Sequence, residues 1–402
     1  MSAPVVVTGL GVTAPNGLGV EAYWSAIRNG VSGLGRVTRF DPARYPVTLA
    51  GEITDFDVKE HLPSRLVPTT DRMTQLALVA SDWALADAAI TPKELADFDS
   101  GVITAASSGG YEFGQRELEN LWSKGSKYVS AYQSYAWFYA VNTGQISIRH
   151  GMRGASGVVV SDQAGGLDAL AQARRQIRKG TRLVLSGGID GSICPWGWVA
   201  QMAGDRMSRS ADPDRAYLPF DRNAGGYVSG EGGAILVLEP AGAAHERGAA
   251  VYGELAGYAS TLDPKPGSGR PPGLRKAIEL ALADAELTAA DVDVVFADAA
   301  ADRELDRIEA EAIVAVFGPG GVPVTAPKVL TGRLYSGAGS LDVVTALLSI
   351  RDDVIPPTVG VVRGAEYDID LVTEVARPAV MYTALVLGRG HGGFNSALIL
   401  RG

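Results

Sequence analysis

The sequence predicts an α/β layered protein built from two similar halves. Apolar, strand-like runs alternate with helical stretches along the whole chain, a pattern typical of α/β folds. The 402 residues are enough for two core-forming units. A similar order of elements occurs twice, which suggests an internal duplication. We therefore expect an N-terminal half over residues 1–240 and a C-terminal half over residues 250–402.

The first half is expected to open on a strand at Val5–Val7 and to close on a strand over residues 233–239. Between them, hydrophobic periodicity and turn residues predict a helix over Thr70–Ala88, strands at Gly101–Ala105 and Val158–Val160, a helix over Leu167–Lys179 ended by Gly180, and a strand over Arg182–Ser186.

The second half restarts with a strand at Val251–Ala259, followed by an exposed Pro/Gly-rich loop over residues 264–273. The elements expected after this loop are a helix over Leu274–Glu286, a strand at Val292–Ala297, a helix over Asp342–Ile350 and a strand pair at Val380–Gly388 and Ser396–Leu400.

Composition narrows the class of protein. Hydrophobic residues make up 46% of the chain and charged residues 20%, as in ordinary globular proteins. No apolar run reaches the roughly 18 residues of a membrane span. The first residues lack a basic segment, so we expect no signal peptide and a cytoplasmic location. The net charge of −9, without a dense Lys/Arg stripe, argues against nucleic acid as a partner.

We expect neither a metal nor a cofactor. The four histidines are scattered, without metal-ligand spacing. Gly9-Leu10-Gly11 imitates a dinucleotide-binding fingerprint, but Pro15 follows where that motif needs a helix. The single cysteine, Cys194, excludes an internal disulfide and follows a Gly-rich turn rather than opening a helix. We therefore expect a packed side chain and not a nucleophile.

The segment around Gln163 carries the clearest functional signal. Val158–Val160, a turn and the helix from Leu167 predict a strand-turn-helix corner, which exposes a side chain beside helix N–H groups. Enzymes place Cys or Ser at such corners to attack an acyl carbon. The carboxamide of Gln163 hydrogen-bonds but does not attack. The chain thus keeps an acyl-transfer scaffold without its reactive atom.

Three stretches resemble β-ketoacyl synthases of the thiolase fold: Gln163–Ala169, Pro219–Gly232 and Gly390–Ala397. The resemblance covers nearly the whole chain. It implies a thiolase-like fold, with two duplicated βαβαβ halves in a layered α-β-α-β-α architecture.

By this resemblance, active members carry Cys at the position of Gln163 and His at the positions of Asp298 and Arg333. The loss of all three resembles the chain length factor, or ketosynthase-beta subunit, of bacterial type II polyketide synthases. Decarboxylative condensation needs a thiolate and neutral imidazoles, so no intact catalytic residue is expected. An ion pair of Arg333 with Asp298 or with Asp162 is a structural alternative for these positions.

The resemblance also implies a polyketide tunnel at the interface with an active ketosynthase-alpha, loaded by an acyl carrier protein. The expected tunnel and chain-length residues are Tyr111, Gly114, Leu118 and Trp196. Residues 111, 114 and 118 share a helix face at i, i+3, i+7 spacing. We expect Gly114 to leave room for a longer chain, whereas Tyr111 argues for a shorter one.

The partner surface is expected at a segment with five aromatics in eight residues and at the strand before Gln163. Its residues are Tyr132, Tyr135, Trp137, Phe138 and Val159. Dense aromatics belong either to a core or to an interface, and an apolar strand edge needs cover.

The resulting hypothesis is a non-condensing subunit that sets the number of malonyl units in an aromatic polyketide. The alternatives are a malonyl-carrier decarboxylase that primes synthesis through Gln163, and a scaffold that stabilises its partner without measuring length.

Overall fold

The computed structural model describes residues 3–402, and a central mixed β-sheet runs through most of it. In the order in which neighbours pair, the main path is β13-β11-β10-β15-β16-β9-β1-β8-β7-β5-β6. Its first-half strands are β1 (Val5–Ala14), β5 (Ser100–Ala105), β6 (Ser156–Val159), β7 (Leu183–Asp190) and β8 (Gly232–Pro240). Its second-half strands are β9 (Gly253–Leu262), β10 (Val294–Phe296), β11 (Pro323–Thr325), β13 (Asp370–Leu371), β15 (Thr383–Gly390) and β16 (Phe394–Arg401).

The two halves of this sheet share one topology. Numbered within its own half, each five-stranded unit has the order 3-2-4-5-1, as β6-β5-β7-β8-β1 and as β11-β10-β15-β16-β9. In both units the first two pairings of that order are parallel and the last two antiparallel. A short pairing of β1 with β9 joins the units. The predicted duplication is therefore present in the fold.

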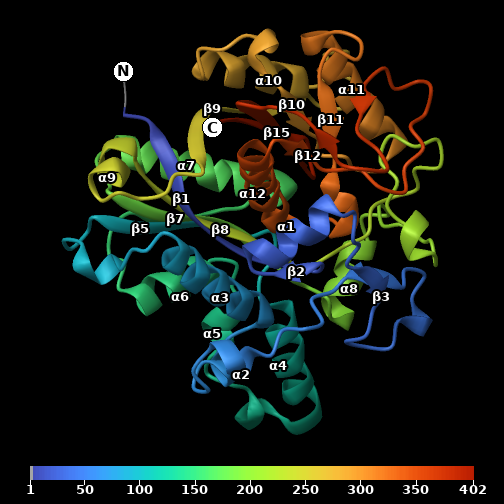
Figure 1. Ribbon diagram of the computed structural model, residues 1–402. Helices are drawn as coiled ribbons and strands as arrows, with labels where there is room; N and C mark the ends of the chain where they lie inside the picture. Colours follow the sequence, from blue (N-terminus) through green and yellow to red (C-terminus); the bar gives the residue numbers. More distant parts are fainter. Residues whose placement is uncertain (1–2) are drawn as a thin grey trace.

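Helices cover both units and fill the space between them, as Figure 1 shows. The first-half helices are α1 (Val20–Arg28), α2 (Val58–His61), α3 (Arg72–Asp87), α4 (Tyr111–Lys124), α5 (Gln133–Ala136), α6 (Val141–His150), α7 (Gly165–Arg178), α8 (Pro195–Met202) and α9 (Ala241–Glu246). The second-half helices are α10 (Leu274–Asp284), α11 (Arg303–Phe317) and α12 (Ser336–Asp352), and short strands β2 (Gly17–Leu18), β3 (Leu34–Arg36), β4 (Leu49–Gly51), β12 (Val354–Ile355) and β14 (Arg377–Pro378) complete the chain.

The layers follow from which helices pack on which strands. The helices α7 and α12 pack against each other between the units, whereas α3 lies on the outer face of the first unit and α10 on that of the second. The resulting α-β-α-β-α layering is the predicted thiolase-like architecture. The helices α4 and α5 project from the body at the bottom of Figure 1.

Glycines on β1 let the outer helix α3 approach the sheet closely. A Cβ at Gly9 would lie 2.2 Å from the backbone oxygen of Ala84 on α3, and a Cβ at Gly11 would lie 1.8 Å from that of Ala80. The Gly9-Leu10-Gly11 run therefore serves helix-on-strand packing within β1. Every residue of β1 is buried, as expected for a strand covered on both faces.

The helix α12 begins six residues before the predicted Asp342. Ser336–Leu341 contains two glycines and resembles a turn in sequence, yet these residues are fully helical and buried. A Cβ at Gly337 would lie 2.0 Å from the oxygen of Gly232, so the helix start packs directly on β8. Tertiary packing overrides the low helix propensity of glycine here.

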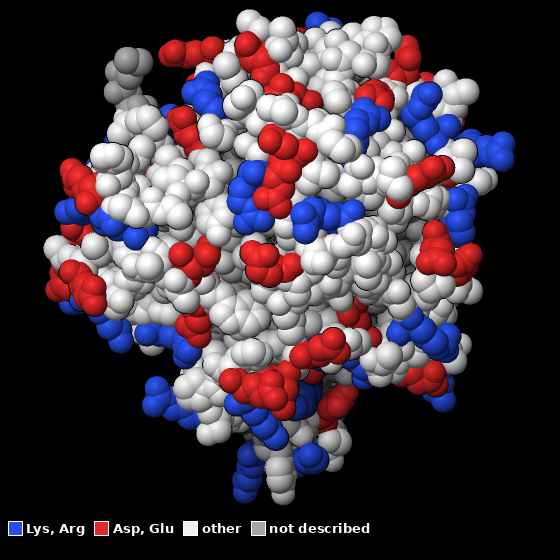
Figure 2. All heavy atoms as spheres, in the orientation of Figure 1, with Lys and Arg blue, Asp and Glu red and all other residues white. Residues whose placement is uncertain are grey.

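Within residues 3–402, no helix combines the length and apolar character needed to cross a membrane. On the face drawn in Figure 2, acidic and basic side chains are interspersed, without a continuous basic stripe.

Candidate functional site

The corner at Gln163 forms where β6 leads into α7. A single 3-10 turn, Asp162–Ala164, separates the strand from the helix. Gln163 is 2% exposed, so its carboxamide lies inside the protein. Asp162 has a left-handed φ of 54°, which Asp tolerates better than most residues, and its carboxylate accepts from the backbone N–H of His391 at 2.9 Å. The predicted strand-turn-helix corner is confirmed, but the expectation that it exposes a side chain was wrong, because Gln163 is buried.

Gln163, Asp298 and Arg333 form one connected cluster, although they stand far apart in the sequence. Arg333 Nη2 lies 3.1 Å from Asp298 Oδ2 and 3.2 Å from Oδ1. In the amide orientation that satisfies its neighbours, Gln163 Oε1 accepts from Arg333 Nε at 2.7 Å. The same amide accepts from the N–H of Tyr335 at 3.3 Å and donates to its carbonyl at 3.0 Å. Of the two partners considered for Arg333, Asp298 forms the ion pair and Asp162 does not.

Backbone groups complete the cluster. Asp298 Oδ1 accepts from the N–H of Arg389 at 2.8 Å, and Arg333 Nη2 donates to the Arg389 carbonyl at 2.8 Å. On α11, Glu309 accepts from the N–H groups of Asp298 (2.7 Å) and Ala299 (2.9 Å). The positions of both charged groups are thus fixed by backbone as well as by each other.

Electrostatics keep both members of the pair ionised. Burial alone would raise the pKa of Asp298, but Arg333, Lys328 and Arg389 outweigh it and hold that pKa below its ordinary value. Burial likewise acts to lower the pKa of Arg333, and Asp298 outweighs it, so the guanidinium stays protonated. The protonated guanidinium cannot accept a proton, and a carboxylate whose pKa is held low is a poor proton acceptor near neutral pH.

Cys194 supplies no substitute nucleophile. It is 5% exposed, and burial raises the pKa of its thiol to about 11. Our expectation that it does not open a helix was wrong: Cys194 is the N-cap residue of α8, because Pro195 at the first helical position starts the helix directly after it.

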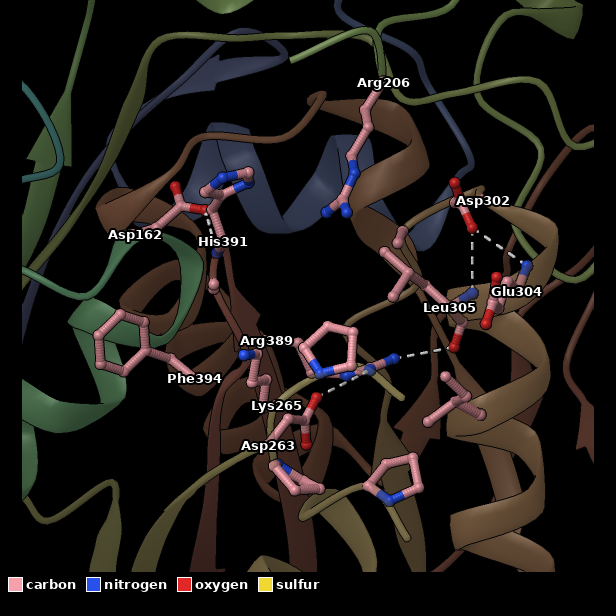
Figure 3. Close-up of a pocket in the computed structure, with 18 of the residues that line it drawn as sticks. Asp162, Arg206, Asp263, Lys265, Asp302, Glu304, Leu305, Arg389, His391 and Phe394 are labelled. Carbon is pink, nitrogen blue, oxygen red and sulfur yellow. Dashed lines mark hydrogen bonds and ion pairs between the residues drawn. The ribbon is translucent and has the colours of Figure 1, made fainter. Parts of the chain in front are cut away.

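A cavity of about 780 Å³ adjoins the cluster, and Arg333 and Asp162 are among the residues that line it. Figure 3 shows Arg206 pointing into this cavity, with Asp162 beside His391 at one side. On the opposite side, Arg389 Nη1 donates to the carbonyl of Leu305 at 2.8 Å. Among the described residues, neither Gln163 nor Asp298 lines the cavity. A group that entered it would meet the Arg333 guanidinium before the Gln163 amide.

Three of the four predicted tunnel residues lie together. Tyr111 and Gly114 are on α4, and the indole of Trp196 on α8 lies against both, with ring centroids of Tyr111 and Trp196 4.8 Å apart. Leu118 lies one turn further along α4 and is 39% exposed. The expectation that Gly114 leaves room was wrong, because a Cβ there would lie 2.9 Å from Trp196 Cζ3. The space beside Gly114 is filled by the indole.

The predicted interface residues lie at the surface. Tyr132, Tyr135, Trp137 and Phe138 are between 37% and 46% exposed, on and beside α5. Val159 is half-buried on β6, which ends the main sheet and pairs with β5 alone among the described strands. These aromatics therefore do not belong to the core of this chain.

Sequence reasoning missed Tyr335, Glu309 and Arg389. Arg389 interrupts the apolar strand that ends at Gly390, and Glu309 lies on the buried face of α11. A charged residue inside an apolar pattern is the signal that could have indicated both.

Comparisons with known proteins agree with this geometry. Residues 2–244 match the family model described as "Beta-ketoacyl synthase, N-terminal domain", and residues 252–362 match "Beta-ketoacyl synthase, C-terminal domain". The chain belongs to the β-ketoacyl synthase family.

Within that family, two similar curated proteins are named for polyketide synthesis. The chain is 62% identical to the actinorhodin polyketide putative beta-ketoacyl synthase 2 of Streptomyces coelicolor, over 99% of this chain and 98% of that protein. It is 60% identical to the tetracenomycin polyketide synthase ketoacyl synthase beta subunit of Streptomyces glaucescens, again over 99% and 98%. These two relatives are thus β-ketoacyl synthase proteins of polyketide synthesis, and the second is named as a beta subunit.

Solved structures show the same fold. The ishigamide ketosynthase/chain length factor has a TM-score of 0.90 at 27% identity, covering 100% of this chain and 99% of that one. A type II PKS acyl-carrier protein in complex with its ketosynthase bound to the hexaketide has a TM-score of 0.89 at 27% identity, with 100% of both chains covered.

Proposed function

We propose that this chain is a non-condensing chain length factor. It pairs with an active ketosynthase-alpha in the cytoplasm, takes no part in carbon–carbon bond formation, and shapes the tunnel in which a carrier-bound polyketide grows. The number of malonyl extensions is then limited by the tunnel wall of this chain.

The observation that carries the proposal is the Gln163–Arg333–Asp298 cluster. Condensation needs a group that holds the acyl chain and neutral groups that stabilise the enolate. Here the three positions satisfy one another's hydrogen bonds and charges, so the corner holds a closed structural unit.

The same cluster disfavours the decarboxylase alternative. A decarboxylating Gln163 would have to donate to a malonyl thioester, but its amide nitrogen donates to Tyr335 O and its oxygen faces Arg333 Nε. Gln163 is also 2% exposed. A substrate would have to break these contacts before the amide could act on it.

Length control is supported by the wall of Tyr111, Gly114 and Trp196, together with the exposed aromatics of residues 132–139. Aromatic side chains with this exposure favour a partner surface, since the partner would bury them. The free edge of β6 offers the partner a strand to pair with.

The test is a substitution in the wall, assayed in the heterodimer with ketosynthase-alpha and malonyl carrier protein. Gly114→Leu forces the Trp196 indole to move, because its Cβ alone would lie 2.9 Å from the ring. We expect the main product to change in length while the heterodimer persists. The control is Gly242→Leu on α9, where a Cβ meets no atom within 4 Å. Unchanged product lengths in an intact Gly114→Leu heterodimer would support the scaffold alternative instead.

A further inference from the structure

The first turn of the wall helix α4 is attached to α3 through one buried carboxylate. Asp71 is the N-cap residue of α3, and its Oδ1 accepts from the N–H of Met73 at 2.9 Å. Its other oxygen, Oδ2, accepts from the N–H of Phe113 on α4 at 2.8 Å. Asp71 is 2% exposed, so both contacts lie inside the protein. A single side chain thus satisfies free N–H groups at the starts of two helices.

The two residues before α4 are glycines, which leave space for this contact. A Cβ at Gly110 would lie 2.7 Å from Asp71 Cβ and 2.3 Å from the carbonyl oxygen of Ala136. A Cβ at Gly109 would lie 1.7 Å from the carbonyl oxygen of Trp137. The N–H of Gly110 donates to that same Trp137 oxygen at 3.0 Å. The start of α4 is therefore held between Asp71 and the backbone of the aromatic segment 132–139.

The wall residues depend on where this turn lies. Tyr111 lies two residues before and Gly114 one residue after Phe113, whose N–H donates to Asp71. The indole of Trp196 lies against both Tyr111 and Gly114. The backbone N–H of Trp196 donates to Gln115 Oε1 on α4 at 2.8 Å. A shift of the first turn of α4 would therefore carry the wall with it.

We propose that Asp71 is a positioning residue for chain-length control, because its two carboxylate oxygens fix the first turn of α4 and with it the wall of Tyr111, Gly114 and Trp196. This inference rests on the proposed function. Asp71 contacts α4 at the N–H of Phe113 and acts on the product only through that helix.

Substitutions at position 71 can remove the contact with α4 and keep the cap of α3. Serine at position 71 can still cap α3 through its hydroxyl, since Ser is as good an N-cap as Asp. Its single oxygen cannot also reach Phe113, so that buried N–H loses its acceptor. Asparagine offers one acceptor oxygen and one donor group, so it satisfies one of the two N–H groups.

The experiment compares heterodimers that carry Asp71→Ser, Asp57→Ser or the wild-type chain. Asp57 caps α2 through Lys59 N at 2.9 Å and makes the matched control, because its carboxylate bonds to no second helix. Hydrogen exchange of the peptide over residues 108–118 and the lengths of the polyketide products are measured on the same samples. For Asp71→Ser we expect about 10-fold faster exchange in that peptide, from one lost buried hydrogen bond. We also expect a broader range of product lengths, with α3 and total malonyl consumption unaffected.

Each outcome decides the proposal. Faster exchange together with altered lengths, absent in Asp57→Ser, supports it. Unchanged lengths overturn it, whether or not exchange rises, and so do altered lengths without faster exchange. If Asp71→Ser yields no heterodimer, Asp71→Asn is judged by the same criteria. Gly114→Leu is run in parallel. If product length is unchanged in both the Asp71 variant and Gly114→Leu, the proposed function itself fails. If product length changes in Gly114→Leu but not in the Asp71 variant, only the role of Asp71 is removed.

Discussion

Arg333 and Asp298 form an ion pair whose side chains are 7% and 2% exposed, with Nη2 and Oδ2 3.1 Å apart. Two charges at this depth are tolerated only because each compensates the other and because Arg389 supplies both an N–H and a carbonyl. The pair stands where, by family resemblance, active members carry histidines. The residues at these two positions therefore lack the proton-transfer chemistry of histidine and form a buried ion pair instead.

The first prediction concerns this pair. Arg333→Ala leaves Asp298 as a buried, unpaired anion, so we expect the free energy of unfolding to fall by about 3–5 kcal/mol. Thermal or denaturant unfolding of the purified subunit complex measures the loss. The control is Arg307→Ala on α11, whose partner Glu311 is 63% exposed, and which is expected to cost under about 1 kcal/mol. Equal losses in the two variants would contradict the structural role of the buried pair.

A second prediction concerns the indole beside Gly114. Trp196→Ala removes the largest side chain that contacts both Tyr111 and Gly114, so the tunnel wall recedes and we expect longer products. Mass spectrometry of the products from the heterodimer checks this. Trp122→Ala on α4 is the matched control, because that indole is 84% exposed and is expected to leave product length unchanged. Products of unaltered length in Trp196→Ala would remove the indole from the wall.

The pH dependence of stability gives a third prediction. Burial, assisted by Glu309 and Asp298, raises the pKa of Asp306 to about 8 from 3.8. Between these values the folded chain holds a proton that the unfolded chain lacks, so this group makes stability fall as pH rises from about 4 to about 8. Asp306→Asn keeps an acceptor for the N–H of Phe220, which Asp306 Oδ2 binds at 2.9 Å, and cannot ionise.

We therefore expect Asp306→Asn to lose less thermal stability than the wild type between pH 5 and pH 9. Melting temperatures at the two pH values provide the comparison. Parallel pH profiles for the two proteins would show that Asp306 has no raised pKa in the folded state.

A fourth prediction tests the aromatic surface. Tyr135→Ser and Phe138→Ser each remove a half-exposed ring from the proposed partner surface, and each is expected to weaken heterodimer formation at least about 10-fold. Analytical ultracentrifugation or titration with ketosynthase-alpha measures the affinity. The control is Tyr382→Ser, since Tyr382 is 67% exposed just before β15. Undiminished affinity in both surface variants would move the interface elsewhere.

Much of this architecture could be predicted from hydrophobic periodicity and turn residues. The helix α3 and the strand–turn–helix corner at Gln163 lie within a few residues of the expected positions. The start of α12 could not be predicted, because Ser336–Leu341 is helical only through its contact with β8 and α7.

Part of the candidate site could also be predicted, since the family motifs identify positions 163, 298 and 333. What joins them could not: the choice of Asp298 over Asp162 depends on the fold placing β10 beside β15. The filled space at Gly114 depends likewise on α8 lying against α4, a contact between segments about 80 residues apart that no local pattern encodes.

The most direct test of the central claim is product analysis of the heterodimer that carries Gln163→Ala, with CO2 release and polyketide length recorded together. If the corner is purely structural, this variant releases CO2 and makes the wild-type product. Its stability falls by about 1–3 kcal/mol, because Arg333 Nε and the N–H of Tyr335 lose an acceptor. Loss of CO2 release and of priming in a folded Gln163→Ala heterodimer would contradict the account and make Gln163 a chemically active residue.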